Sequence, residues 1–365
     1  MTTKIHGTTG VEYGGINVTG PPNRNVIDNG EMQINQRGTV ASITSSQYAG
    51  PDRWKANLNA GTWTVSGETD SPTGFTNSYK ILCTTANSSL SAGSIVQVYQ
   101  AIEGQNLQRF KKGTADALQF AVSFWVKSNV TGTYIVELHD NDNSRCVSAS
   151  YTISSSATWE KKTITFPADS TGAFDTNNGD SFKIYFKLAA GTNFTSGTLQ
   201  TSAWIAQDNT KRAAGQVNLA AATNNYWQVT GVQIEAGSTN TEFEHKLIND
   251  SMVRCQRYLR VYGGHAAYQR IGIGYFSNND RIECPLPLAP QMRTTPTMSV
   301  SDAGHWKAES PSGSGEFTAV GLDGNSSNQV AIVWGDKSGT FTGGESGRYL
   351  ADNTTDARIY LSSEL

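Results

Sequence analysis

Hydrophobic and polar residues alternate along much of the chain, which is the pattern of strands that are buried on one side. The even positions of two such segments are all large and apolar: Phe120, Val122, Phe124 and Val126, then Phe182, Ile184, Phe186 and Leu188. Similar segments recur about every dozen residues between residues 24 and 246, with Gly, Asn, Ser and Asp runs between them and no helical pattern. The pattern predicts an all-β fold in which two antiparallel sheets pack face to face over residues 24–246.

The spacing of apolar residues changes at residues 247–262, where we expect one short helix. Apolar residues recur there at helical spacing: Met252, Cys255, Leu259 and Tyr262. This helix would join the sandwich to a smaller C-terminal β domain at residues 263–365. Within that domain, the segment 284–290 contains three prolines, so we expect an edge strand or a connector there and not a central strand.

Residues 1–23 contain many glycines and few large apolar side chains, so this segment cannot bury enough surface to fold alone. It is either a floppy tail or an extended arm that a partner orders, and we favour an N-terminal docking arm. The anchors of that arm would be its spaced apolar residues: Ile5, Val11, Tyr13, Ile16 and Val18.

Composition narrows the class of protein. Of the 365 residues 16% are charged, against about 25% in an average protein. No run of about 18 apolar residues occurs, so we expect no membrane insertion, and the first residues lack the apolar core of a signal peptide. The net charge of −3 gives no electrostatic basis for nucleic-acid binding. The 4 cysteines lie far apart, which favours reduced or buried thiols over a disulfide framework.

Catalytic motifs are missing from the sequence: it contains no Walker loop, no HExxH and no GxSxG. A glycan depolymerase would need two carboxylates facing each other across a cleft, and no such pair is marked out. We therefore expect no enzymatic activity and no cofactor, and two alternatives stay open: a glycan-degrading depolymerase and a structural calcium ion. Asp140 and Asp142 could supply oxygen ligands to a structural calcium ion, although an Asn/Asp hairpin turn explains the same residues and is favoured.

Exposed aromatic side chains are the candidates for ligand binding, because sugar rings stack on aromatic faces while polar side chains bond to sugar hydroxyls. The C-terminal domain supplies six candidates for glycan binding: Tyr268, Tyr275, His305, Trp306, Trp334 and Tyr349. The alternative for each is a place in the core or at a contact between sister chains, since a domain of about a hundred residues needs such side chains for its own core.

A set of short blocks in fixed order carries a resemblance to a known family. The blocks are Asn25–Gly38, Asp52–Trp54, Phe124–Ser128, Thr158–Pro167, Trp227–Gly237 with Phe243–His245, Arg254–Tyr258 and Met292–Thr297. Together they resemble a bacteriophage tail-fibre and virion-protein family that is common in marine phages. The resemblance implies a jelly-roll domain similar to carbohydrate-binding modules, followed by a small C-terminal β domain. It also implies a structural or adhesive role, usually as a homotrimer, and the family carries no agreed catalytic residues.

We therefore expect a virion protein, either a short tail fibre or a receptor-binding protein, that is assembled in the host cytoplasm. Its partners would be sister chains in a homotrimer, other phage tail or virion proteins at the N-terminal arm, and host-surface polysaccharide. The alternatives are a head fibre, decoration protein or tail adaptor with a purely structural role, and a secreted carbohydrate-binding module or enzyme. The lack of a signal-peptide pattern counts against the secreted alternative.

Overall fold

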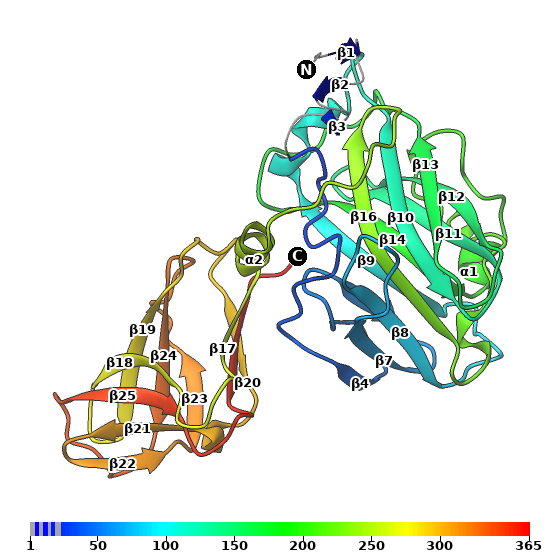
Figure 1. Ribbon diagram of the computed structural model, residues 1–365. Helices are drawn as coiled ribbons and strands as arrows, with labels where there is room; N and C mark the ends of the chain where they lie inside the picture. Colours follow the sequence, from blue (N-terminus) through cyan, green and yellow to red (C-terminus); the bar gives the residue numbers. More distant parts are fainter. Residues whose placement is uncertain (1–3, 7–9, 14–15, 19–22) are drawn as a thin grey trace. The chain divides into compact units, whose positions relative to one another are not determined.

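The computed structural model of the protein describes residues 4–6, 10–13, 16–18 and 23–365, with side chains from residue 23 onward. The chain divides into two compact units. Unit 1 comprises Met1–Ser251 together with Leu365, and unit 2 comprises Met252–Glu364. Strands make up most of the regular structure in both units (Figure 1).

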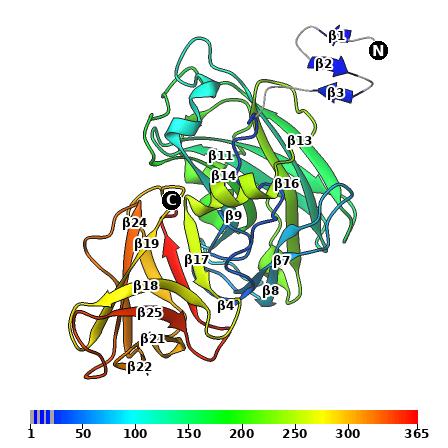
Figure 2. The same ribbon diagram turned by 60° about the vertical axis from the view of Figure 1, so that its left-hand side comes forward.

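Unit 1 is an antiparallel jelly-roll β-sandwich. Its six-stranded sheet has the order β13 (Glu160–Phe166), β10 (Phe120–Ser128), β16 (Tyr226–Ala236), β8 (Ser78–Thr85), β7 (Thr62–Glu68) and β4 (Val40–Ile43). Its seven-stranded sheet has the order β15 (Ile205–Ala206), β12 (Arg145–Ile153), β11 (Gly132–Asp140), β14 (Asp180–Ala190), β9 (Ile95–Glu103), β6 (Lys55–Leu58) and β5 (Gln47–Tyr48). The chain crosses repeatedly between the sheets, which lie face to face in Figure 2.

The predicted alternation is confirmed in unit 1. All the even positions of β10 and β14 that were predicted to be apolar are fully buried in one core between the two sheets: Phe120, Val122, Phe124, Val126, Phe182, Ile184, Phe186 and Leu188. The connections contain only short helices, which are η1 (Gly104–Asn106), η2 (Gln108–Phe110), α1 (Thr192–Thr195), η3 (Asn209–Lys211) and η4 (Leu219–Ala221). Strand pairing and core burial therefore hold this unit together.

The N-terminal segment forms three short strands. They are β1 (Lys4–His6), β2 (Gly10–Tyr13) and β3 (Ile16–Val18), and they pair antiparallel in chain order. The side chains of the predicted docking residues Ile5, Val11, Tyr13, Ile16 and Val18 lie outside the described part of the protein. Their role in docking therefore stays a prediction.

Helix α2 (Ile248–Gln256) is shorter than the predicted helix of residues 247–262. The prediction is wrong for the second half, because Leu259–Gly263 forms strand β17 and pairs with β26 (Arg358–Ser362) near the other end of the chain. Leu259 is buried in this pairing. A partner more than ninety positions away in the sequence thus overrides the local helical spacing of Leu259 and Tyr262.

Unit 2 contains two sheets around its own core. The three-stranded sheet has the order β17, β26 and β20 (Thr297–Val300). The seven-stranded sheet has the order β22 (Gly313–Glu316), β21 (Trp306–Ser310), β25 (Ser346–Ala351), β18 (Arg270–Phe276), β19 (Arg281–Pro287), β24 (Val330–Asp336) and β23 (Ala319–Leu322). One face of this larger sheet supplies most of the core, and the other face points outward.

The proline-containing segment forms β19, which lies between β18 and β24, so the prediction of an edge strand or connector is wrong in this respect. The pairing with β18 reaches only Ile282 and Glu283, whereas the pairing with β24 extends to Pro287. The Leu288 amide donates to Gln329 on the β24 side. Backbone direction alternates along a strand, so the nitrogens of Pro285 and Pro287 face the side of β18, where the pairing between the two strands has already ended.

None of the helices in the described part of the chain is long and apolar enough to cross a membrane. All four cysteines are buried, and burial raises the pKa of the Cys146 and Cys284 thiols to about 11. These thiols therefore behave as small apolar core groups and not as nucleophiles.

Candidate ligand-binding face of unit 2

Two of the six aromatic candidates are core residues. Trp306 and Tyr349 are completely buried in the core of unit 2, with their ring centroids 5.9 Å apart. The prediction that they form part of a glycan platform is wrong, because their positions at the start of β21 and within β25 point to the inner face of the sheet. His305 ends the short helix η5 (Ala303–His305), where its ring lies 3.3 Å from the hydroxyl of Ser301.

The other three aromatic candidates lie on or beside the outward face of the seven-stranded sheet. Tyr268 is 49% exposed and Tyr275 is 51% exposed, whereas Trp334 is half-buried. Charged and apolar side chains accompany them. We call this surface the C-terminal face and define it by Tyr268, Ile273, Tyr275, Arg281, Glu283, Lys307, Glu309, Trp334, Asp336 and Arg348.

One row of this face runs across five strands through Tyr275. Strand pairing aligns Ser346, Tyr275, Glu283, Trp334 and Gly321 in that order. The Tyr275 hydroxyl donates a hydrogen bond of 2.7 Å to Glu283, which fixes the ring and raises the pKa of Tyr275. At neutral pH the face therefore presents a neutral phenol beside a carboxylate.

Trp334 is held from two sides. A Cβ atom on Gly321 would lie only 2.2 Å from Cζ2 of Trp334, so the indole occupies the space that a side chain at Gly321 would need. The guanidinium of Arg281 lies 4.2 Å from the centre of one ring of Trp334 and donates hydrogen bonds of 2.7 and 2.8 Å to Asp336. Trp334 thus supports a fixed guanidinium, whose N–H groups are donors for a polar ligand.

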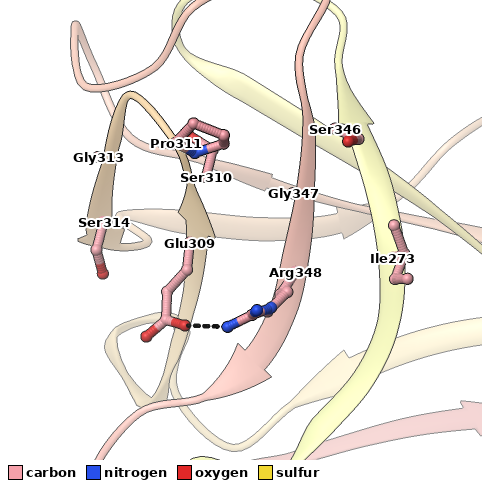
Figure 3. Close-up of a pocket in the computed structure, with 9 residues that line it drawn as sticks. All are labelled: Ile273, Glu309, Ser310, Pro311, Gly313, Ser314, Ser346, Gly347 and Arg348. Carbon is pink, nitrogen blue, oxygen red and sulfur yellow. Dashed lines mark ion pairs between the residues drawn. The ribbon is translucent and has the colours of Figure 1, made fainter.

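A second row runs parallel to the first and aligns Ile273, Arg348, Glu309 and Ser314 on four neighbouring strands. An open hollow of about 780 Å³ lies over this row and is also lined by Ser310, Pro311, Gly313, Ser346 and Gly347 (Figure 3). Arg348 and Glu309 point toward one another across the hollow, and 3.6 Å separates Nη1 from Oε2. The two rows meet on β18, where Ile273 and Tyr275 lie on the same face about 7 Å apart.

Tyr268 lies at the other end of the C-terminal face. The ammonium of Lys307 lies 4.7 Å from the centre of the Tyr268 ring and 3.5 Å from the Glu309 carboxylate. The charges of the face therefore occur as neighbouring opposite pairs, Lys307 and Arg348 around Glu309, and Arg281 with Asp336. A face of this kind attracts polar groups without carrying a strong field of one sign.

The predicted calcium loop forms the hairpin turn that was favoured. Strand β11 ends at Asp140 and β12 begins at the paired residue Arg145. Asp140 is fully buried and bonds to the ammonium of Lys112, which also lies 3.1 Å from Asp169, and the Asp142 carboxylate accepts a hydrogen bond of 2.9 Å from the backbone amide of Asp175. Among the residues that the structure describes, no group of three or more His, Cys, Asp or Glu side chains is arranged to hold a metal ion.

Reasoning from the sequence selected only the aromatic members of the C-terminal face. It missed Ile273, Glu283 and Arg348, which complete the two rows. The alternation of β18 carried a usable signal, because Ile273 and Tyr275 are two residues apart and must share a face. Glu283 on β19 was also within reach of the sequence, because it lies eight residues from Tyr275 across a hairpin. The partner on β25 could not be assigned, because register between strands far apart in sequence depends on the tertiary fold.

Comparison with known proteins gives likenesses in structure alone. The sequence matches no protein-family model and no curated protein. The enzymatically active domain of bacteriophage CBA120 tailspike protein 4 is similar at 14% identity with a TM-score of 0.34, over 59% of this chain and 22% of that one. The chain therefore spans about a fifth of the tailspike structure.

A CBM4 structure is similar at 14% identity with a TM-score of 0.29, over 57% of this chain and 99% of that one. The family 11 carbohydrate-binding module from Clostridium thermocellum, solved with a mixed-linked tetrasaccharide, is similar at 13% identity with a TM-score of 0.28, over 57% of this chain and 98% of that one. Likenesses at these TM-scores carry no argument about function, so the proposals below rest on the residues of this chain.

Proposed function

We propose that the protein is a glycan-binding adhesin and that the C-terminal face of unit 2 is its binding surface. The observation that carries the proposal is the row through Tyr275, where a half-exposed aromatic ring stands beside a carboxylate and a fixed guanidinium on one open sheet face. Sugar rings combine apolar C–H faces with a rim of hydroxyl groups. The Tyr275 ring can stack on the C–H face, while Glu283 and Arg281 can form hydrogen bonds with the hydroxyl groups.

The balance of charge indicates which glycans would bind. Arg281 faces Asp336, and Arg348 faces Glu309, so the surface has no excess of positive charge to hold a polyanion. We infer that the ligand is a neutral glycan, bound weakly at each site. Several copies of the chain would multiply that weak affinity on a surface that repeats the same sugar.

A glycan array probed with the full chain tests this proposal. We expect binding to neutral glycans, and we expect Tyr275→Ala to weaken it at least tenfold because the ring is the exposed apolar contact. Tyr275→Phe keeps the ring and should retain most of the affinity. Tyr226→Ala, a half-buried tyrosine of unit 1 beside Lys80, is the matched control and should leave binding unchanged. An array without signal, or full affinity in Tyr275→Ala, would contradict the proposal.

We also propose that this adhesion serves a bacteriophage virion, in a short tail fibre or receptor-binding protein docked through its N-terminal strands. The support is the ordered set of blocks between residues 25 and 297. Mass spectrometry of purified virions should detect the chain, and antibody labelling should place it on the tail. Labelling of the head surface instead would favour a head fibre or decoration protein. Loss of residues 1–23 should abolish incorporation, and if incorporation persists the docking role is wrong.

We further propose that the chain forms a homotrimer and that it binds glycans without cleaving them. In solution the full chain should have three times the mass of 39.3 kDa, measured by light scattering during size-exclusion chromatography. Incubation with a bound glycan should release no new reducing ends. Glu309 is the carboxylate that lines the hollow, and its contacts with Arg348 and Lys307 suit ligand binding better than proton transfer. A monomeric mass or a steady release of reducing ends would contradict these two points.

A further inference from the structure

Ile273 is the most exposed large apolar side chain of unit 2, at 73%, although it lies on an inner strand of the sheet. An isolated exposed isoleucine needs no explanation, but this one lines the hollow of the C-terminal face together with Pro311. A hollow of about 780 Å³ is within the usual range for small-molecule sites. The hollow therefore has an apolar contact at Ile273 that a plain polyhydroxyl ligand would leave in contact with water.

The contact between Arg348 and Glu309 leaves both groups open to a ligand. Arg348 lies 3.6 Å from the Glu309 carboxylate, which is longer than an ordinary N–H···O hydrogen bond of about 2.7–3.2 Å. Lys307 is 3.5 Å from Glu309 but lies closer to Asp352, at 3.1 Å. The Arg348 side chain is 53% exposed. A donor and an acceptor thus stand side by side, next to an apolar contact, on three neighbouring strands (Figure 3).

This arrangement matches the acetamido group. That group has a methyl for an apolar contact, a carbonyl oxygen that accepts a hydrogen bond and an N–H that donates one. We propose that the hollow selects a glycan containing N-acetylated amino sugars, with the methyl on Ile273 and the carbonyl accepting from Arg348. The C=O and N–H of a trans amide point in opposite directions, so Glu309 would instead accept from a neighbouring hydroxyl of the same sugar. The inference rests on the proposed function of the C-terminal face and names its substrate class.

The position of Tyr275 in the neighbouring row is consistent with an acetamido group at Ile273. Tyr275 and Ile273 are about 7 Å apart on one face, so a sugar ring stacked on Tyr275 can extend a substituent toward Ile273. A sugar carboxylate in the same place would be attracted by Arg348 but repelled by the Glu309 carboxylate beside it, so the pair gives it no net advantage. A plain hydroxyl could bond to both polar groups but would leave Ile273 in contact with water.

Matched sugars that differ only in one substituent test the inference on the full chain. The probes are oligosaccharides with 2-acetamido, 2-amino or 2-hydroxy groups, together with a 6-deoxy series that carries a methyl without an amide. We expect the acetamido member to bind about tenfold more tightly than the hydroxy member, which corresponds to about 1.4 kcal/mol. Titration calorimetry measures each affinity directly.

Variants separate this inference from the proposed function. Ile273→Ser should reduce the tenfold preference to about two- or threefold, because part of it comes from the methyl contact. The matched control is Val330→Ser, which changes an apolar side chain with 36% exposure on the same sheet face outside the hollow. Control and parent should show the same preference.

Three outcomes would overturn the inference. Binding that depends on Tyr275 but shows no acetamido preference leaves the proposed function intact and removes the acetamido assignment. Preference for the 6-deoxy series keeps the methyl contact but rejects the amide contacts. If no glycan binds and Tyr275→Ala has no effect, the proposed function itself fails, and the inference fails with it.

Discussion

The buried ammonium of Lys112 gives a sharp test of what stabilises unit 1. The side chain has no exposed surface and bonds to the carboxylate of Asp140, and it lies 3.1 Å from that of Asp169. It also donates to the backbone carbonyls of Thr171 at 3.1 Å and Gly172 at 2.7 Å. The substitution Lys112→Ala removes this cation and leaves the oxygens around it in place.

The loss of folding stability in Lys112→Ala depends on the partners that Asp140 and Asp169 keep. Asp169 keeps Arg145 at 2.8 Å, so its charge stays compensated. Asp140, which is completely buried, keeps only hydrogen bonds from Asn143 among the contacts described for it. One buried carboxylate without a counter-ion costs about 3–5 kcal/mol. A domain of this size should then unfold at a temperature lower by roughly 10 °C.

Urea denaturation of the full chain, followed by intrinsic fluorescence, measures this loss in the transition of unit 1. Lys183→Ala is the matched control, because its partner Asp180 at 2.6 Å is partly exposed and the pair should contribute at most about 1 kcal/mol. If Lys112→Ala changes the unfolding free energy by less than about 1 kcal/mol, the reasoning about the buried charge is wrong.

The variant Lys112→Ala also allows a test for calcium at Asp140 and Asp169, which differ from the predicted ligand pair Asp140 and Asp142. Without Lys112, two carboxylates and two carbonyl oxygens converge on one space, and oxygen ligands of this kind suit Ca²⁺. At a concentration about a hundred times the dissociation constant, Ca²⁺ would restore about 2.7 kcal/mol. We expect calcium to stabilise Lys112→Ala and to leave the parent unchanged. If calcium gives no response in the variant, the four oxygens do not form a site.

Three further predictions concern stability and the binding face. Trp306→Ala should lower the unfolding free energy of unit 2 by about 3–5 kcal/mol in urea, because this side chain is fully buried. Burial lowers the pKa of His139 from 6.5 to about 4, so between these values the unfolded chain binds a proton that the folded chain does not. Unit 1 should therefore lose up to ~3 kcal/mol as the pH falls from 6.5 to 4, and His139→Asn should remove that slope in unfolding measurements. Gly321→Ala should weaken glycan binding at least threefold in calorimetry by displacing Trp334, whereas Gly324→Ala, which meets no atom within 4 Å, should not.

Much of the sandwich could be predicted because the alternation that marks each strand lies within a short stretch of the sequence. Each strand of unit 1 shows its buried face through a period of two, and Phe120–Val126 and Phe182–Leu188 lie in the core as predicted. The helix prediction failed where local and distant information disagreed. Residues 259–262 continue a helical spacing, but their pairing with β26 buries Leu259 and satisfies the backbone in a sheet.

The candidate site could be predicted only in part. The residue types of a strand do not show which face of the sheet each side chain occupies, because that depends on how the strand pairs with its neighbours. Trp306 and Tyr275 are both aromatic residues of short strands, yet one is fully buried and the other is half-exposed. The sequence shows that a strand contains an aromatic residue, while the pairing of β18, β21 and β25 decides which side of the sheet receives it. The members of the two rows come from strands up to 75 residues apart, such as Ile273 and Arg348.

The charge network around Glu137 in unit 1 and the charge pair at the hollow of unit 2 differ in what satisfies them. In unit 1, the Glu137 carboxylate is fully buried and accepts a hydrogen bond of 2.8 Å from Arg212, and Lys187 lies 3.5 Å away. Such a network is satisfied internally and fixes the packing of its segments. In unit 2, the contact between Arg348 and Glu309 is longer than a hydrogen bond and opens on a hollow. Arg348 and Glu309 are exposed to solvent, so a ligand can take the place of water at these groups, which the buried network around Glu137 does not allow.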